Sequence, residues 1–317
     1  MNIVKIKCIN DIVIIDGISR SGKFYLGKLV AGINGLEYFI NDSEMERILI
    51  SNRLGLLTDY NASALLVIVM NEAIYNMAIG RNINMKHGDG SSVLNSFEKE
   101  LYINRQNNTT AGESCVKGIT SQKRSSVFIL HQSLHSIDVV KKATPSSKII
   151  NIRRHPIDLA YSWIKSGWGY RFANDPLSFD PVCDYKGHPV PDFAINWAAE
   201  YIASNEYDRV VKSIVHLTEE ENRVIEGKRH DICFVYYDNL IKQPDKEMSK
   251  ICTFLNRSPH ESMTEIIEKE RKEDISFQSQ RKMKMEYINS GVIDKLSFDK
   301  LLELGNRYEK NINDGGA

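Results

Sequence analysis

The sequence lacks an excess of charge of either sign. Its 41 Lys and Arg residues are balanced by 41 Asp and Glu residues over 317 positions, so the formal net charge is zero. A chain without net charge has no overall field that attracts nucleic acid or an anionic membrane surface. We therefore expect no nucleic-acid partner, and any site for an anion must be built locally.

Long apolar runs are also missing. The longest uninterrupted run covers residues 64–70, whereas a helix needs roughly 20 apolar residues to cross a bilayer. Residues 1–9 alternate between apolar and polar side chains and contain no apolar core of a signal peptide. These absences predict a cytoplasmic protein without a membrane span; they leave its oligomeric state open.

Cysteine is scarce and scattered. The five cysteines form no Cys-x-x-Cys pair and show no Cys/His spacing typical of a metal site. We expect reduced thiols and no bound metal. The apolar content of 42% and charged content of 26% are ordinary for a globular protein, and the length suits one α/β domain with insertions.

A strand, a turn of small residues and a helix follow one another in residues 11–33, DIVIIDGISRSGKFYLGKLVAGI. Residues 11–16 read as a short buried strand, and residues 25–33 carry apolar side chains at helical spacing. The turn between them leaves backbone N–H groups unpaired at the helix start, where they favour an anion. The segment predicts a phosphate-binding loop, with an ordinary tight turn as the alternative.

This loop nearly matches the nucleotide-triphosphatase pattern G-x-x-x-x-G-K-[ST], from Gly17 to Lys23. The next residue is Phe24, however, where a hydroxyl would hold magnesium. The substitution favours a phosphate-bearing donor whose reaction needs no metal.

Further strands are expected at residues 127–130, 148–152 and 232–236, with helices between them. This rhythm predicts an α/β fold, a three-layer sandwich with a central, mostly parallel sheet in a single domain covering residues 1–317. Ligands of such sheets gather beyond the carboxyl ends of the strands, so Lys23, His131 and Arg154 are expected to face one crevice. Residues 80–123 form either a lid or a disordered segment, and residues 167–191 an aromatic-rich insertion.

A second motif follows the strand at residues 148–152. Arg154 stands at the strand tip, Pro156 suits the first turn of a helix, and Ser162 comes two helical turns later. An arginine fork and a serine hydroxyl can both reach one phosphate. Two anion sites on one sheet edge imply a ligand with two separated phosphates.

Together these motifs resemble the sulfotransferase family, enzymes that use 3′-phosphoadenosine 5′-phosphosulfate (PAPS) and release 3′,5′-adenosine diphosphate (PAP). The family's first loop reads P-K-S-G-T-T-W or G-x-x-R-S-G-T-T, and its second motif, R-x-P-x-D-x-x-x-S, is matched from Arg154 to Ser162. A tyrosine pattern, Y-E-D followed by an apolar residue, is similar to residues 236–240. The resemblance implies a sulfotransferase with a P-loop fold and no metal.

The family's roles carry over position by position. Arg20 stands at the basic residue that stabilises the leaving phosphate, and Lys23 shares or takes over that role. Arg154 and Ser162 correspond to the 3′-phosphate site, and Arg281 and Lys282 are similar to a segment, R-K-G, that closes over it. The expected donor-binding residues are Gly17, Ser19, Arg20, Ser21, Gly22, Lys23, Phe24, Tyr25, Arg154, Ser162, Tyr236, Arg281 and Lys282.

His131 follows the strand at residues 127–130, where catalytic histidines of this family lie, and it is the expected general base. Glu44 is the alternative base, since related branches use a glutamate after the first helix. The aromatic insertion favours a carbohydrate-type acceptor hydroxyl. A P-loop small-molecule kinase and a non-catalytic nucleotide-binding protein are the competing functions.

Overall fold

The structure is a computed structural model that describes the chain except for residues 110, 122–123, 228–229, 272–276 and 314–317. Within the described residues, a parallel sheet of five strands has the order β2-β3-β1-β4-β7. These strands are β1 (Ile12–Asp16), β2 (Ile40–Asn41), β3 (Ser126–Ile129), β4 (Lys148–Arg153) and β7 (Ile232–Tyr236). The predicted α/β class with a parallel central sheet is confirmed.

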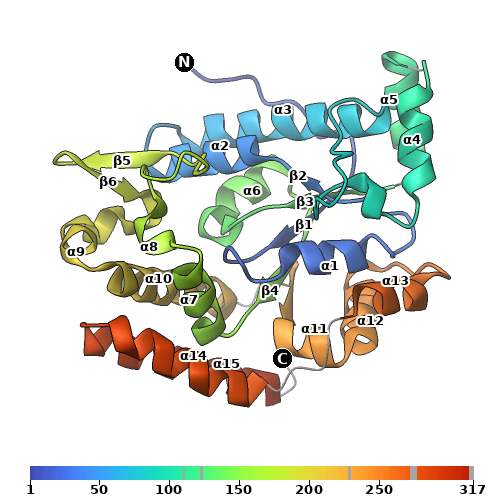
Figure 1. The fold of residues 1–317 in the computed structure, drawn as a ribbon. Coiled ribbons are helices and arrows are strands. Elements are labelled where there is room, and N and C mark those ends of the chain that lie inside the picture. The colour runs from blue at the N-terminus through green and yellow to red at the C-terminus, as the bar shows by residue number, and fades with distance from the viewer. Residues whose placement is uncertain (110, 122–123, 228–229, 272–276, 314–317) are drawn as a thin grey trace.

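Helices cover both faces of this sheet (Figure 1). Alternate residues of a strand face opposite sides, so Ile14 packs with α2, α3 and α6, and Ile15 packs with α1, α12 and α13. All five residues of β1 are buried, as expected for a strand covered on both faces. The helices are α1 (Lys23–Val30), α2 (Ser43–Arg53), α3 (Asp59–Ala78), α6 (Ile137–Ala143), α11 (Tyr237–Lys242), α12 (Pro244–Leu255) and α13 (Met263–Glu270).

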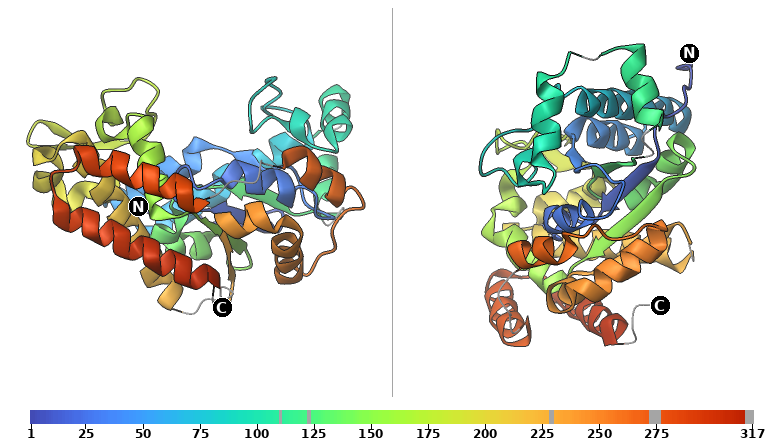
Figure 2. Two further views of the ribbon diagram at one scale, coloured as in Figure 1. Left: turned by 60° about the horizontal axis from the view of Figure 1, so that its bottom comes forward. Right: turned by 90° about the vertical axis from the view of Figure 1, so that its right-hand side faces the viewer.

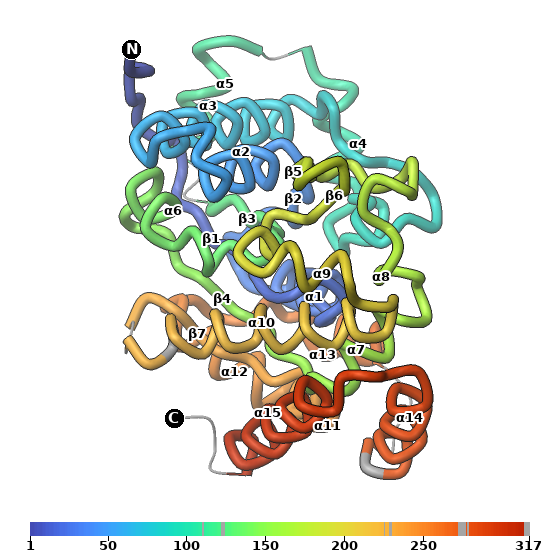
Figure 3. Tube along the Cα trace, turned by 90° about the vertical axis from the view of Figure 1, so that its left-hand side faces the viewer, coloured from blue at the N-terminus to red at the C-terminus, as the bar shows by residue number. Residues whose placement is uncertain are grey.

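A further group of helices packs beyond the end of β4. It comprises α7 (Pro156–Lys165), α10 (Glu206–Glu226), α14 (Phe277–Gly291) and α15 (Lys295–Asn313). In both views of Figure 2, α14 and α15 lie together at one edge of the molecule, and α10 packs against α7 and α15 (Figure 3). Ile18, in the loop between β1 and α1 (called here the donor loop), packs in the same apolar cluster as these helices.

The segment at residues 80–123 contains η1 (Val93–Asn95), α4 (Lys99–Asn107) and α5 (Glu113–Ser121). A buried carboxylate, Glu37, ties α4 to the body of the protein. It accepts two hydrogen bonds from Arg105, both at 2.8 Å, one from Arg124 at 2.9 Å and one from the Tyr102 hydroxyl at 3.0 Å. Arg105 holds the pKa of Glu37 below its usual range despite burial, so the carboxylate stays ionised.

The aromatic insertion at residues 167–191 forms α8 (Trp168–Arg171) and a hairpin of β5 (Val182–Tyr185) and β6 (His188–Pro191). The Arg47 side chain on α2 donates a hydrogen bond to the Phe179 carbonyl at 3.2 Å. This contact attaches the insertion to α2. Among the helices of the described residues, none combines the length and apolar character that a membrane-spanning segment needs.

Candidate active site

The loop between β1 and α1 has a backbone that only small residues permit at two positions. Gly22 has φ +107°, and a Cβ there would lie 2.7 Å from the Tyr237 ring. Gly17 has φ +152°, and its Cβ would lie 2.5 Å from the Ile152 carbonyl oxygen. The loop therefore needs glycine at both ends, and α1 begins directly after it with no side-chain cap. Its first N–H groups remain available for an anion.

One cavity of about 640 Å³ opens at the carboxyl edge of the sheet. The expected meeting of Lys23, His131 and Arg154 is seen there, because β1 pairs with β3 and β4 in parallel and all three strands end at this edge. Other predicted donor residues that line it are Ser19, Arg20, Gly22, Phe24 and Tyr25. Gly17, Ser21 and Ser162 are not part of its wall.

The two predicted phosphate motifs are in direct contact. The Arg20 Nε donates to the Ser162 hydroxyl at 3.1 Å, and the Arg154 guanidinium donates to the Arg20 carbonyl at 2.7 Å. The Trp163 indole donates to the Ser19 carbonyl at 2.9 Å and fixes the loop on α7. Loop and helix thus form one cationic end of the cavity, called here the donor end.

Lys23 points back into its own loop. Its ammonium donates to the Gly17 carbonyl at 2.7 Å and the Ile18 carbonyl at 3.1 Å, and the residue is only 4% exposed. Burial lowers the pKa of Lys23 to about 8, while Asp16 opposes that shift. At neutral pH the ammonium is mostly charged and holds the loop together from inside.

The tyrosine that meets the loop is Tyr237 rather than the predicted Tyr236. Tyr237 packs on Gly22, its ring lies 4.8 Å from the Arg154 guanidinium, and it lines the cavity. Tyr236 lies outside the cavity wall and packs edge-on against Tyr308 at 5.3 Å. Reading the Y-E-D pattern back from its apolar residue, Leu240, would have placed its tyrosine at Tyr237.

Arg281 and Lys282 are not brought to the cavity. Arg281 is buried and donates to Asp158 at 3.0 Å and to Asp238 at 2.7 Å, so its charge is already matched by two carboxylates. Lys284 donates to Asp158 at 2.6 Å. Lys282 is exposed on α14. Arg281 and Lys284 thus join α7, α11 and α14 instead of facing the donor end.

At the tip of β3, the strand next to β1, His131 is paired with a carboxylate that the sequence had not indicated. Its Nδ1 is hydrogen-bonded to Glu46 on α2, and both residues line the cavity. The predicted alternative, Glu44, is instead exposed and paired with Arg47 at 3.2 Å. The two glutamates are two positions apart on one helix, about 200° around its axis, so only Glu46 faces the site.

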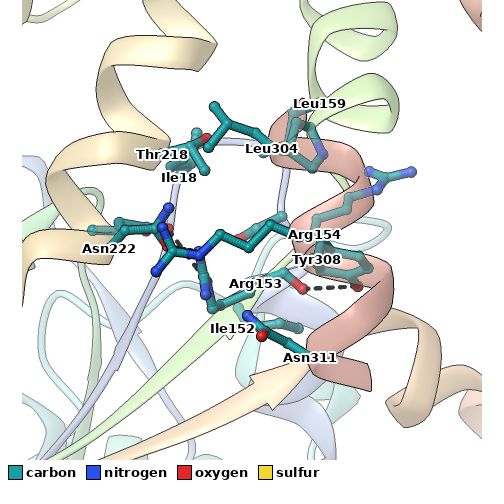
Figure 4. A pocket seen from close by; sticks show the side chains of 14 residues that line it. Ile18, Ile152, Arg153, Arg154, Leu159, Thr218, Asn222, Leu304, Tyr308 and Asn311 are labelled. Carbon is teal, nitrogen blue, oxygen red and sulfur yellow. Dashed lines mark hydrogen bonds and ion pairs between the residues drawn. The ribbon is translucent and has the colours of Figure 1, made fainter. Parts of the chain in front are cut away.

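A much smaller cavity of about 10 Å³ lies behind the loop, between β4, α10 and α15 (Figure 4). This is room for roughly one water molecule. Among the described residues, the Ser21 and Thr218 hydroxyls at its wall have no hydrogen-bond partner. Glu221, only 2% exposed, also faces it, with Arg153 Nε 3.9 Å from its carboxylate. Burial raises the pKa of Glu221 to about 7.

Within the described ranges, no group of three or more His, Cys, Asp or Glu side chains could hold a metal ion. The residues present do suit a phosphate-bearing donor, because the Arg154 Nε, on the wall of the larger cavity, is a buried polar atom without a partner in that part of the chain. Arg20, Arg154 and Ser162 would hold such a donor.

Comparison with known proteins gives one family match, to the sulfotransferase domain, over residues 10–300. No curated protein sequence matches the chain. Solved structures that resemble it include a sulfotransferase domain from the curacin biosynthetic pathway (14% identity, TM-score 0.45, 98% of this chain and 99% of that chain). Others are the corresponding domain of the Synechococcus PCC 7002 olefin synthase (13%, 0.48, 96% and 97%) and a mouse sulfotransferase complexed with PAP (14%, 0.41, 95% and 88%).

Proposed function

The chain belongs to the sulfotransferase family, and on that premise we propose that it moves the sulfuryl group of PAPS to a hydroxyl of a carbohydrate-type acceptor. The observation that carries the proposal is the shared cavity of about 640 Å³, whose wall brings Arg20 and Arg154 together with His131 and several aromatic side chains. Cations suit a phosphate-bearing donor, and aromatic faces next to polar groups suit a sugar ring.

At the donor end, Arg154 and Ser162 bind the 3′-phosphate, and Arg20 stabilises the charge that develops on the leaving phosphate. Arginine is suited to both tasks because its planar fork donates several hydrogen bonds to one phosphate. Lys23 contributes indirectly, since its ammonium is engaged by the loop carbonyls. Tyr25 and Tyr237 line the same end and supply faces for the adenine.

At the acceptor end, His131 removes the proton of the attacking hydroxyl. Its Nδ1 is occupied by Glu46, so Nε2 is the nitrogen left to accept that proton. The carboxylate holds the imidazole in one tautomer and stabilises the imidazolium that forms. PAPS supplies the sulfuryl group, which passes in line to the acceptor oxygen, while charge stabilisation by the arginines replaces a metal.

Calorimetry tests the donor. PAP is expected to bind, and binding of ATP with Mg²⁺ alone would overturn the proposal in favour of a kinase. Arg154→Ala should weaken binding of PAP far more than binding of 5′-AMP, because only PAP carries the 3′-phosphate. Equal losses for both nucleotides would show that Arg154 does not contact that group.

Turnover with labelled PAPS and a panel of sugars, phenols and lipids tests the base and the acceptor. His131→Ala should lower kcat by about 10²-fold or more and leave PAP affinity unchanged. Glu46→Gln should lower kcat in the same direction, while Glu44→Gln, exposed on the same helix, serves as the matched control. Unchanged turnover in His131→Ala would place the base elsewhere, and transfer to phenols alone would refute the carbohydrate assignment.

A further inference from the structure

The acceptor end of the cavity carries an uneven set of charges. Here the acceptor end means the part of the cavity wall around His131, whose ionisable side chains are Glu46, Arg53, His131, Arg171, Asp180 and Asp192. Three are carboxylates and two are guanidinium groups. Which of these charges a ligand meets depends on which of them are already paired within the protein.

Both arginines of the acceptor end have carboxylate partners within the protein. The Arg53 Nε donates to Asp192 at 2.7 Å. The Arg171 Nε lies 3.4 Å from Asp175, and its guanidinium also lies 4.9 Å from the Trp168 ring. Glu46 is engaged by His131. Among the described residues, neither arginine forms a hydrogen bond or an ion pair with Asp180.

Asp180 remains. Across the part of the chain that the structure describes, its carboxylate makes no hydrogen bond and no ion pair. It is half-buried in the aromatic insertion. Burial raises its pKa and the negative charge of Glu46 adds to the rise, while His131 and Arg171 oppose it without reversing it. A carboxylate held out of water without a partner gains most from a ligand that donates hydrogen bonds to it.

The neighbouring aromatic rings complete this subsite. Phe172 and Trp168 line the same wall, and Phe172 packs edge-on against Phe193 with ring centroids 5.6 Å apart. Such rings stack on the apolar face of a sugar and also attract cations. Neither interaction compensates a negative charge placed beside Asp180.

We propose that Asp180 determines acceptor specificity: it accepts hydrogen bonds from hydroxyl or ammonium groups of the acceptor and excludes acceptors that carry a carboxylate, phosphate or sulfate. This inference rests on the proposed function and narrows its acceptor class to neutral and cationic carbohydrates. A product already bearing a sulfate near this position would be a poor acceptor for a second transfer, because its charge would face the unpaired carboxylate.

A matched pair of glycosides tests the proposal. The full-length protein, saturated with PAP, is titrated calorimetrically with p-nitrophenyl β-glucoside and with p-nitrophenyl β-glucuronide, which differ in one carboxylate. The glucoside should bind about tenfold or more tightly, the size expected for one like-charge contact near a protein surface. Asp180→Asn, which breaks no internal hydrogen bond, should reduce that ratio towards one.

Asp184→Asn is the control. Asp184 is an exposed residue of β5 that does not line the cavity, so this variant should keep the wild-type ratio. Equal affinity of the wild type for both glycosides, failure to bind either one, or an unchanged ratio in Asp180→Asn would each overturn the proposal. Absence of PAP binding would instead refute the proposed function, so the two failures are distinguishable.

Discussion

The carboxylate of Glu221 behind the donor loop has a calculable effect on stability. The residue lies on α10 and is 2% exposed. Asn151 donates to it at 3.5 Å, and Arg153 Nε is 3.9 Å away. Burial raises its pKa from 4.5 to about 7 against the opposing attraction of Arg153, and the nearby charge of Asp16 adds to the rise.

A raised carboxyl pKa means that the folded state binds the Glu221 proton more tightly than the unfolded chain. Between pH 4.5 and about 7 the folded state therefore holds more protons, and the free energy of unfolding falls as the pH rises through this window. A shift of this size corresponds to about 3 kcal/mol. Glu221→Gln removes the charge and keeps the shape, so it should stabilise the protein by up to about 3 kcal/mol at pH 8 and little at pH 4.5.

Urea unfolding, followed by tryptophan fluorescence at several pH values from 4.5 to 8, measures this difference. Glu219→Gln, two positions away on the same helix, controls for the loss of a carboxylate as such. Other groups titrate in every variant, so the difference between variants is the quantity to compare. If wild type and Glu221→Gln show the same pH dependence, the carboxyl is ionised at its ordinary pH and the reasoning fails.

Two further substitutions test the donor loop and the buried ion pairs of Glu37. Gly22→Ala should destabilise the protein by about 1–3 kcal/mol and weaken PAP binding. Residue 22 has φ +107°, and the new Cβ would lie 2.7 Å from the Tyr237 ring. An unchanged melting temperature and an unchanged PAP affinity would contradict this. Glu37→Gln should lower the free energy of unfolding by about 3–5 kcal/mol, because it leaves the charge of Arg105 without its buried partner, whereas Arg124 keeps Glu98 at 2.6 Å. A loss below 1 kcal/mol in urea would count against it.

Much of the donor end could be predicted from local patterns. The apolar run before Gly17, the glycines of the turn and the helix that follows form a strand-loop-helix unit that can be recognised from the order of residue types along the chain. Arg154 at a strand tip and Ser162 two helical turns later could likewise be recognised from their spacing along the chain. Parallel strands end at one edge of the sheet, so their tips could be placed together without a structure.

The orientation of individual side chains could not be predicted in this way. Glu44 and Glu46 are equally polar, and only the packing of α2 shows that Glu46 faces His131. Arg281 carries the residue type expected for a phosphate ligand, yet Asp158 and Asp238 from distant elements already neutralise it.

The sequence by itself determined the fold class, the phosphate-binding loop and the residues at the strand ends, because these follow from periodicity and short spacings along the chain. Only the tertiary structure decided which charges remain free to meet a ligand. Lys23 is engaged by its own loop, Arg53 is paired with Asp192, and Asp180 has no hydrogen-bond or ion-pair partner among the residues that the structure describes. Charge pairing is decided by contacts between residues far apart in sequence, and those contacts exist only after the chain has folded.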